Sequence, residues 1–111
     1  MELIETTIFT GQITDLLDDD EYATFQMLLA QNPAAGALIR GGGGIRKIRV
    51  AARSHGKRGG ARVIYYWARR QDQILLLLAY AKNATADLTP KQAAGLGELV
   101  KKEFGNEPGI V

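Results

Sequence analysis

Residues Gly41–Trp67 read GGGGIRKIRVAARSHGKRGGARVIYYW. The stretch combines a glycine run, a basic strand-like segment, a basic glycine-rich loop and a second strand that ends in three aromatic residues. Ten of the fourteen Lys and Arg residues lie between Arg40 and Arg70, whereas no Asp or Glu occurs between Glu21 and Asp72. Cations gathered on neighbouring strands, with carboxylates kept away, favour a surface that binds a polyanion.

Length and composition limit the class of protein. The 111 residues suffice for one hydrophobic core and not for two, so we expect a single domain over residues 1–111. The net charge is only +2, and it is the uneven distribution of charge that points to a polyanion. The absence of cysteine excludes disulfides and thiolate chemistry and suits the cytoplasm. The acidic N-terminus does not resemble a signal peptide, and the apolar run Ile74–Ala81 is far shorter than the roughly 20 residues of a membrane span, so we expect no membrane partner.

The first part of the chain predicts one strand followed by two helices. Ile and Thr residues indicate a strand over Leu3–Phe9, and Thr10 or Thr14 is a candidate cap for the first helix. The acidic run Asp18–Glu21 favours the start of a second helix, because carboxylates stabilise the positive end of the helix dipole. That helix is predicted to end at Asn32–Pro33, and its apolar residues at helical spacing are Tyr22, Phe25, Leu28 and Leu29.

The remaining residues predict three strands and a C-terminal helix. Ile45–Ala51 and Arg62–Arg69 are strands on either side of the basic loop. Arg70–Gln73 is a turn into the buried strand Ile74–Ala81. A threonine cap followed by proline predicts the last helix over Pro90–Phe104. The expected order is β-α-α-β-β-β-α, an α+β fold in which an N-terminal helical hairpin and a C-terminal helix pack on a small antiparallel sheet.

Four basic residues are predicted to meet at one end of this sheet. Arg49 lies on one strand and Arg62 begins the next. Lys57 and Arg58 lie in the loop between these strands, so antiparallel pairing brings all four together. A single surface Lys or Arg is more often simply solvated, but such a cluster can hold a phosphate through charge-assisted hydrogen bonds.

The aromatic residues near this cluster allow two interpretations. Tyr65, Tyr66 and Trp67 alternate between the faces of their strand, so at least one belongs to the core, and an exposed one could stack on a base. Tyr80 ends a buried strand and is a core residue or a site residue with equal weight.

Other chemistries fail at required positions. The run Gly41–Gly44 precedes a strand and not a helix, so it is no dinucleotide fingerprint. Gly56–Lys57 resembles the end of a phosphate-binding loop, but Ala51 and Arg58 stand where that motif needs glycine and Ser or Thr. The single His55 has no carboxylate near it in sequence, so we interpret it as a solvated loop residue and predict neither a metal nor a cofactor.

Three segments that follow one another along the chain carry a family resemblance. They are Gly44–Arg49, Gly56–Tyr66 and Leu77–Asn83 with Asp87–Thr89. In this order and at this spacing they resemble the RelE/HigB toxins of bacterial toxin–antitoxin pairs, over nearly the whole chain. The resemblance implies a small antiparallel sheet with an N-terminal helical hairpin. It also implies an mRNA interferase that cleaves messenger RNA in the ribosomal decoding site and is held off by a cognate antitoxin.

The resemblance also implies roles for single residues. In RNA cleavage without a metal the 2′-hydroxyl attacks the adjacent phosphate, and cations and a phenol can divide the work of proton transfer and charge stabilisation. Arg62 would hold the scissile phosphate, Lys57 would assist it or the leaving group, and Tyr80 would transfer a proton or stack on a base. No tyrosine follows Tyr80, which departs from the founding RelE pattern and leaves the general base open. The residues implied to contact RNA or the ribosome are Arg46, Lys47, Arg49, Arg58, Tyr65 and Lys82, with Arg49 steering the RNA and Lys82 supporting Tyr80.

The expected partners are messenger RNA, the ribosome and a cognate antitoxin of the helix-turn-helix, HigA-like kind. Two other functions stay open. A gyrase-poisoning toxin of the ParE kind shares the fold without the ribonuclease site, although the grouping of Lys57, Arg62 and Tyr80 argues against it. A non-catalytic RNA-binding module would need only the same basic face.

Overall fold

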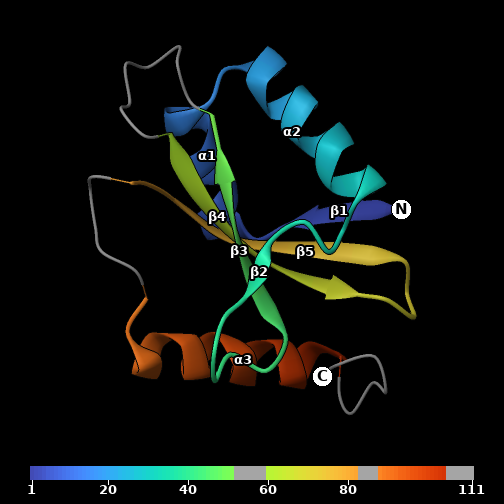
Figure 1. Cartoon of the computed structure of the whole chain (residues 1–111), viewed down its shortest axis with the longest axis vertical. Helices are drawn as coiled ribbons and strands as arrows, with labels where there is room; N and C mark the ends of the chain where they lie inside the picture. The colour runs from blue at the N-terminus through green and yellow to red at the C-terminus, as the bar shows by residue number, and fades with distance from the viewer. Residues whose placement is uncertain (52–59, 83–87, 105–111) are drawn as a thin grey trace.

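The structure, a computed structural model, describes residues 1–51, 60–82 and 88–104 (Figure 1). Its five strands form one sheet in the order β1-β5-β4-β3-β2. Helices α1 and α2 lie over one face of this sheet and α3 lies over the other (Figure 1). Within these ranges no helix is both long enough and apolar enough to cross a membrane. The elements along the chain are β1 (Glu2–Glu5), α1 (Thr7–Leu16), α2 (Asp19–Gln31), β2 (Ala37–Leu38), β3 (Ile45–Val50), β4 (Ala61–Ala68), β5 (Gln73–Ala81) and α3 (Pro90–Phe104).

The predicted α+β fold is confirmed, with its helical hairpin, its run of strands and its C-terminal helix. Two features of the sheet differ from the prediction. β1 runs parallel to β5, with Glu2 opposite Gln73, so the sheet is mixed and not antiparallel. The connector after α2 contains the additional strand β2, whose two residues pair with Arg46 and Lys47. The observed order is therefore β-α-α-β-β-β-β-α.

The start of α1 also differs from the prediction. The Thr6 hydroxyl accepts a hydrogen bond from the Phe9 N–H at 3.1 Å. Thr6 therefore caps the helix in place of the predicted Thr10 or Thr14, and β1 ends at Glu5, four residues earlier than expected. Phe9 is fully buried on the inner side of α1, and this burial outweighs the strand preference of the Ile and Thr residues around it.

The predicted helix start at the acidic run is confirmed, and two of its carboxylates also cap α2. The Asp18 carboxylate accepts from the Glu21 N–H at 2.7 Å, and the Glu21 carboxylate accepts from the Asp18 N–H at 3.0 Å. This reciprocal pair satisfies two N–H groups that would otherwise lack partners at the helix start. The helix ends at Gln31, with Asn32 as the C-cap, as the proline that follows predicts.

α3 begins at the predicted threonine and proline. The Gln92 N–H donates to the Thr89 hydroxyl at 3.1 Å, and the Gln92 side-chain carbonyl accepts from the Thr89 N–H at 2.9 Å. The middle of the helix lies against the glycine run before β3, because a Cβ atom on Gly97 would lie 2.5 Å from the Gly42 carbonyl oxygen. Glycine at position 97 is therefore required for α3 to lie this close to the glycine run.

Two apolar layers hold the helices on the sheet. Consecutive residues of β4 alternate between these layers, so Tyr65 and Tyr66 are both core residues, at 0% and 1% exposure. Trp67 is partly buried and packs against the layer under α1 and α2. The layer under α1 and α2 includes Phe9, Ile13, Phe25, Leu29, Val63 and Tyr65. The layer under α3 includes Ile45, Ile64, Tyr66, Leu77, Ala93 and Val100.

Candidate functional site

Three predicted site residues form one row across the sheet. Arg49 on β3 is directly opposite Arg62 on β4, and Arg62 is directly opposite Tyr80 on β5. Residues paired in this way project to the same face of a sheet. Tyr80 packs against the layer under α3, so the row lies on the α3 face. We call Arg49, Arg62 and Tyr80 the site row.

The two arginines of the site row are close together. The Lys82 N–H donates to the Gly60 carbonyl at 3.2 Å, so the backbone groups of Gly60, and two residues later those of Arg62, point toward β5. Arg62 therefore faces Arg49 in a pair without backbone hydrogen bonds, the kind in which opposite Cα atoms are about 4.5 Å apart. Like charges directly opposite each other are destabilising, and an anion between them offsets that repulsion.

The members of the site row differ in exposure. Arg49 is exposed, whereas Arg62 is partly buried and one of its guanidinium nitrogens, Nη1, donates to the Ala61 carbonyl at 3.2 Å. Tyr80 is partly buried, and its hydroxyl oxygen is shielded from solvent. The row thus runs from a cation in water to a phenol beneath the surface.

Lys47 extends the basic surface along β3. It lies two residues before Arg49 and therefore on the same face. Its side chain lines a pocket of about 380 Å³ between β2 and the beginning of α3. The N-terminal end of α3 adds partial positive charge to this pocket, so the α3 face is basic from β2 to β4.

Gly60 places the start of β4 beside the end of β3. Its φ is +74°, and a Cβ atom there would lie 2.2 Å from the Val50 carbonyl oxygen. Glycine is therefore needed at the point where the chain returns to the sheet just before Arg62. Lys82 follows β5 at this same end and is exposed. The predictions for three further residues lie outside the described part of the chain: His55, Lys57 and Arg58.

Within the described ranges no group of three or more His, Cys, Asp or Glu side chains could hold a metal ion. The acidic run at the start of α2 lies over the sheet face opposite the site row. On that side Glu5 accepts hydrogen bonds from Tyr22 at 2.5 Å and from Thr10 at 2.6 Å. Burial, reinforced by this carboxylate, raises the pKa of Tyr22 above its ordinary value. Anionic and cationic side chains are thus partly sorted onto two faces of the sheet.

Residues 17–107 match the family model described as the RelE toxin of the RelE/RelB toxin–antitoxin system. The chain belongs to the RelE toxin family. The matched range includes the whole site row and every helix and strand from α2 to α3. The protein is thus the toxin component of a toxin–antitoxin system, with a cognate antitoxin as its partner. Its narrower assignment to the HigB group stays a prediction.

Of the predicted RNA contacts of this RelE toxin, Tyr65 does not fit the structure, and Arg46 lies apart from the site row. Tyr65 has 0% exposure, and its hydroxyl donates to the Pro33 carbonyl at 2.7 Å and accepts from the Gly36 N–H at 2.9 Å. Burial raises the pKa of the Tyr65 phenol. Arg46 lies on the face opposite the site row, where it donates to the Gly36 carbonyl at 2.8 Å. Both side chains hold the connector between α2 and β2 in place. The sequence could not reveal this, because the partners are backbone groups of a loop.

We expect Tyr65→Phe to destabilise the RelE toxin without impairing its chemistry. The substitution leaves the buried Gly36 N–H without its acceptor, at a cost of about 1 to 3 kcal/mol in the free energy of unfolding. Urea denaturation measures that loss, and the activity of each folded molecule should stay within about twofold of wild type. Unchanged stability combined with weakened RNA binding would restore Tyr65 as a contact residue.

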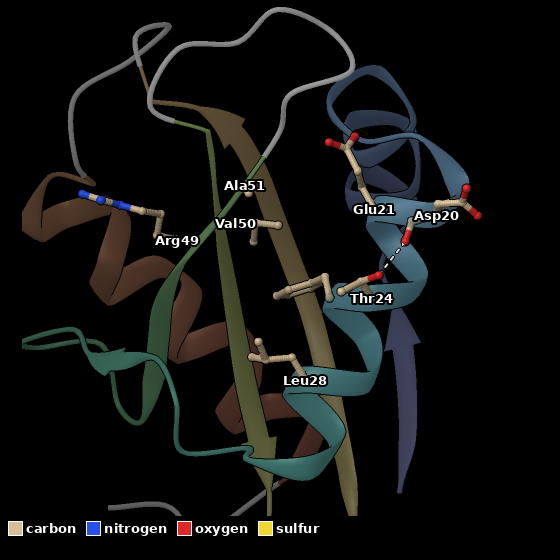
Figure 2. A pocket seen from close by; sticks show the side chains of 8 residues that line it. Asp20, Glu21, Thr24, Leu28, Arg49, Val50 and Ala51 are labelled. Carbon is tan, nitrogen blue, oxygen red and sulfur yellow. Dashed lines mark hydrogen bonds between the residues drawn. The ribbon is translucent and has the colours of Figure 1, made fainter.

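A groove that no sequence pattern predicts lies on the helical-hairpin side of this toxin. It has a volume of about 390 Å³ and lies between α2 and the end of β3 (Figure 2). Leu28, one of the apolar residues at helical spacing in α2, is 50% exposed at its wall. Helical spacing puts Leu28 among the apolar residues of α2. The spacing does not show that the helix extends beyond the sheet surface that it covers, where Leu28 is exposed.

Proposed function

We propose that this RelE toxin is a ribosome-dependent endoribonuclease, an mRNA interferase that cleaves messenger RNA in the decoding site and stops translation. The observation that supports this proposal is the site row, in which neighbouring strands bring two guanidinium groups and one phenol together on one face. An activity of this kind takes place in the cytoplasm, where the ribosomes are.

The proposed reaction is an internal transesterification. The 2′-hydroxyl loses its proton and its oxygen bonds to the adjacent phosphorus, while the bond from phosphorus to the 5′-oxygen of the next nucleotide breaks. That 5′-oxygen takes up a proton, and the products are a 2′,3′-cyclic phosphate and a 5′-hydroxyl end. The enzyme must stabilise the extra negative charge on the phosphate and move the protons.

Arg62 is proposed to hold the phosphate as that charge develops. It lies between Arg49 and Tyr80 in the row, and its partial burial lowers the local dielectric constant, which strengthens its attraction to an anion. Arg49, which is exposed, is proposed to steer the RNA, together with Lys47. Lys57 is proposed to assist Arg62 at the phosphate or to assist the leaving group.

Tyr80 is proposed to transfer a proton or to stack on a base beside the scissile bond. Its hydroxyl is shielded from solvent in the free protein, so bound RNA must displace the groups that cover it. Lys82 follows two residues later and is proposed to support Tyr80.

We expect this toxin to cut ribosome-bound message at least about tenfold faster than the same RNA free in solution. A row of cations without an obvious strong base relies on the ribosome to hold the 2′-oxygen in line with the leaving oxygen. Single-turnover cleavage of one labelled message in both states measures the ratio. Equal rates would contradict the proposed dependence on the ribosome.

Treatment of the toxin with a chelator should leave its activity unchanged. The toxin is incubated with EDTA, desalted, and added to ribosome complexes kept in magnesium. We expect the cleavage rate to stay within about twofold of that of untreated toxin, because cations and a phenol supply the proposed chemistry. A rate that falls after EDTA and returns with one added metal would replace this mechanism by a metal-dependent one.

Expression in growing cells separates the proposal from the other two functions. An mRNA interferase produces new 5′-hydroxyl ends within translated messages, and these ends are mapped by sequencing. A gyrase poison produces DNA breaks without such ends, and a binding module produces neither. Loss of the ends in an Arg62→Ala variant connects the cuts to the site row.

A further inference from the structure

The groove between α2 and β3 is open on its outer side and apolar within (Figure 2). Leu28 is half exposed at the wall that α2 forms, whereas Val50, from β3, is nearly buried. Figure 2 shows Val50 directed into the groove and the Arg49 side chain directed away from it, toward the α3 side. The residues that line the groove are Asp20, Glu21, Thr24, Phe25, Leu28, Arg49, Val50 and Ala51.

The edge of the sheet beside this groove is only partly paired. β2 pairs with β3 only at Arg46 and Lys47, and in the part of the chain that the structure describes no strand continues that pairing toward Ala51. The Ile39 N–H donates to the Ile45 carbonyl at 2.9 Å, so the backbone groups of every second residue from Ile45 point to this outer edge. The backbone of Arg49 is among them. An open edge of this kind is a template for another strand.

A strand added at this edge would meet two different surfaces. Side chains of a strand alternate between the faces of the sheet. One set would enter the groove and pack on Leu28 and Val50, where apolar side chains are favoured. The other set would lie on the α3 face beside Lys47 and Arg49, where carboxylates are favoured. Residues 22–71 of this chain contain no carboxylate, so the partner has to supply them.

We propose that this edge binds an extended segment of the cognate antitoxin in which apolar residues alternate with Asp or Glu. The inference rests on the membership of the chain in a toxin family and does not depend on the ribonuclease activity. The carboxylates of such a segment would pair with Arg49, the exposed end of the site row, and would repel an approaching RNA backbone. Neutralisation would then follow from strand addition itself.

A helical partner fits this site less well. A helix in the groove would form no hydrogen bonds with the outward backbone groups of Arg49. With its apolar stripe in the groove, its polar face would point into solvent. It would therefore not bring carboxylates to the α3 face, where Lys47 lies. Asp20 and Glu21 lie at one end of the groove, where a Lys or Arg flanking the alternating residues of a longer segment would be favoured in addition.

The test uses an end-blocked, fluorescein-labelled peptide of eight residues, Glu-Val-Glu-Leu-Glu-Val-Glu-Leu, titrated with the full-length protein and followed by anisotropy without RNA or ribosomes. We expect it to bind at least about tenfold more tightly than a peptide of the same composition whose four glutamates form one block, since only alternation serves both faces. Equal affinity of the two peptides would overturn the proposal. Because the assay contains no ribosome, its outcome is separate from that of the cleavage experiments.

Matched protein variants locate the site. Leu28→Asp should weaken binding of the alternating peptide at least tenfold, whereas Met27→Asp, at a neighbouring position that is 65% exposed and outside the groove lining, should change it less than twofold. Thr24→Arg, at an exposed position in the lining, serves as the second variant if Leu28→Asp fails to fold. Equal effects inside and outside the groove would overturn the proposal.

Modified peptides separate a strand from other modes of binding. N-methylation of alternate residues in one phase removes the N–H groups that would face β3, and N-methylation in the other phase leaves them intact. We expect one phase to abolish binding and the other to retain it. Two phases with the same effect would contradict strand pairing. A second copy of the chain is the remaining candidate for the groove, and sedimentation of the protein alone tests it. A dimer that Leu28→Asp converts to a monomer would assign the groove to that second copy and overturn the proposal.

Discussion

Replacing Arg62 by alanine is expected to lower the single-turnover rate of messenger cleavage on stalled ribosomes by about 10²- to 10³-fold, which corresponds to about 2.7 to 4 kcal/mol, the range for one lost transition-state donor. Arg62 is the middle residue of the site row, with Arg49 on one side and Tyr80 on the other. Its contact with the phosphate should strengthen as negative charge builds up, so its loss affects the chemical step more than binding.

Three further measurements show whether the lower rate comes from the loss of the Arg62 contact with the phosphate. Arg62→Lys keeps the charge but loses the planar, two-pronged contact, so it should recover only part of the rate. Arg70→Ala removes an exposed arginine in the turn at the far end of β4 and should cut like wild type. Thermal unfolding should show a stable Arg62→Ala protein, because the substitution relieves the repulsion from Arg49. An Arg62→Ala variant that cuts normally would remove Arg62 from the site, and one that fails only in ribosome binding would reduce it to a steering residue.

The meeting of Arg49 and Arg62 could be predicted from the sequence because it depends on local connectivity. Two strands joined by one loop pair in antiparallel fashion, and the residues next to that loop then lie opposite each other. The caps of α2 and α3 could be predicted for a similar reason, since each cap is a contact between residues three positions apart. The α1 cap is the local exception, because Thr6 takes the place of the predicted Thr10 or Thr14.

The other errors concern contacts between distant parts of the chain. β1 lies beside β5, about seventy residues away in sequence, and no local pattern shows that the two strands run parallel. Tyr65 was predicted as a possible RNA contact because alternation shows that neighbouring residues face opposite sides, but not that helices cover both sides. Leu28 has the helical spacing of its apolar neighbours but is half exposed, because that spacing does not show where the covered sheet surface ends.

Arg49 connects the two surfaces that this structure brings together. Its side chain is directed toward the α3 side, within the site row, while its backbone lies at the open edge beside the groove (Figure 2). A ligand at either surface therefore changes the environment of the same residue. The proposed ribonuclease site and the proposed antitoxin site thus share Arg49, whereas Leu28 belongs to the groove alone, so Leu28→Asp should weaken neutralisation while the site row stays intact.

Tyr80→Phe is expected to lower the cleavage rate by about 10²-fold or more if the phenol transfers a proton, since a positioned acid or base contributes about 10²- to 10⁴-fold. The substitution keeps the aromatic ring and the packing of Tyr80 against the layer under α3, so it removes the hydroxyl alone. Tyr66→Phe is the matched control, because Tyr66 is a buried tyrosine on the same face of the sheet, and its rate should stay within about threefold of wild type.

A third variant, Tyr80→Leu, distinguishes the two proposed roles of the residue. If Tyr80 transfers a proton, the phenylalanine and leucine variants should lose similar factors of rate, because neither side chain carries a hydroxyl. If Tyr80 stacks on a base, the phenylalanine variant should cut nearly as fast as wild type and the leucine variant should be slow, since stacking contributes about 1 to 3 kcal/mol per base. The rates are measured in single turnover at saturating toxin, so that weaker binding does not enter. Near-normal rates for both variants would place Tyr80 in the core alone and move the proton transfer to another group.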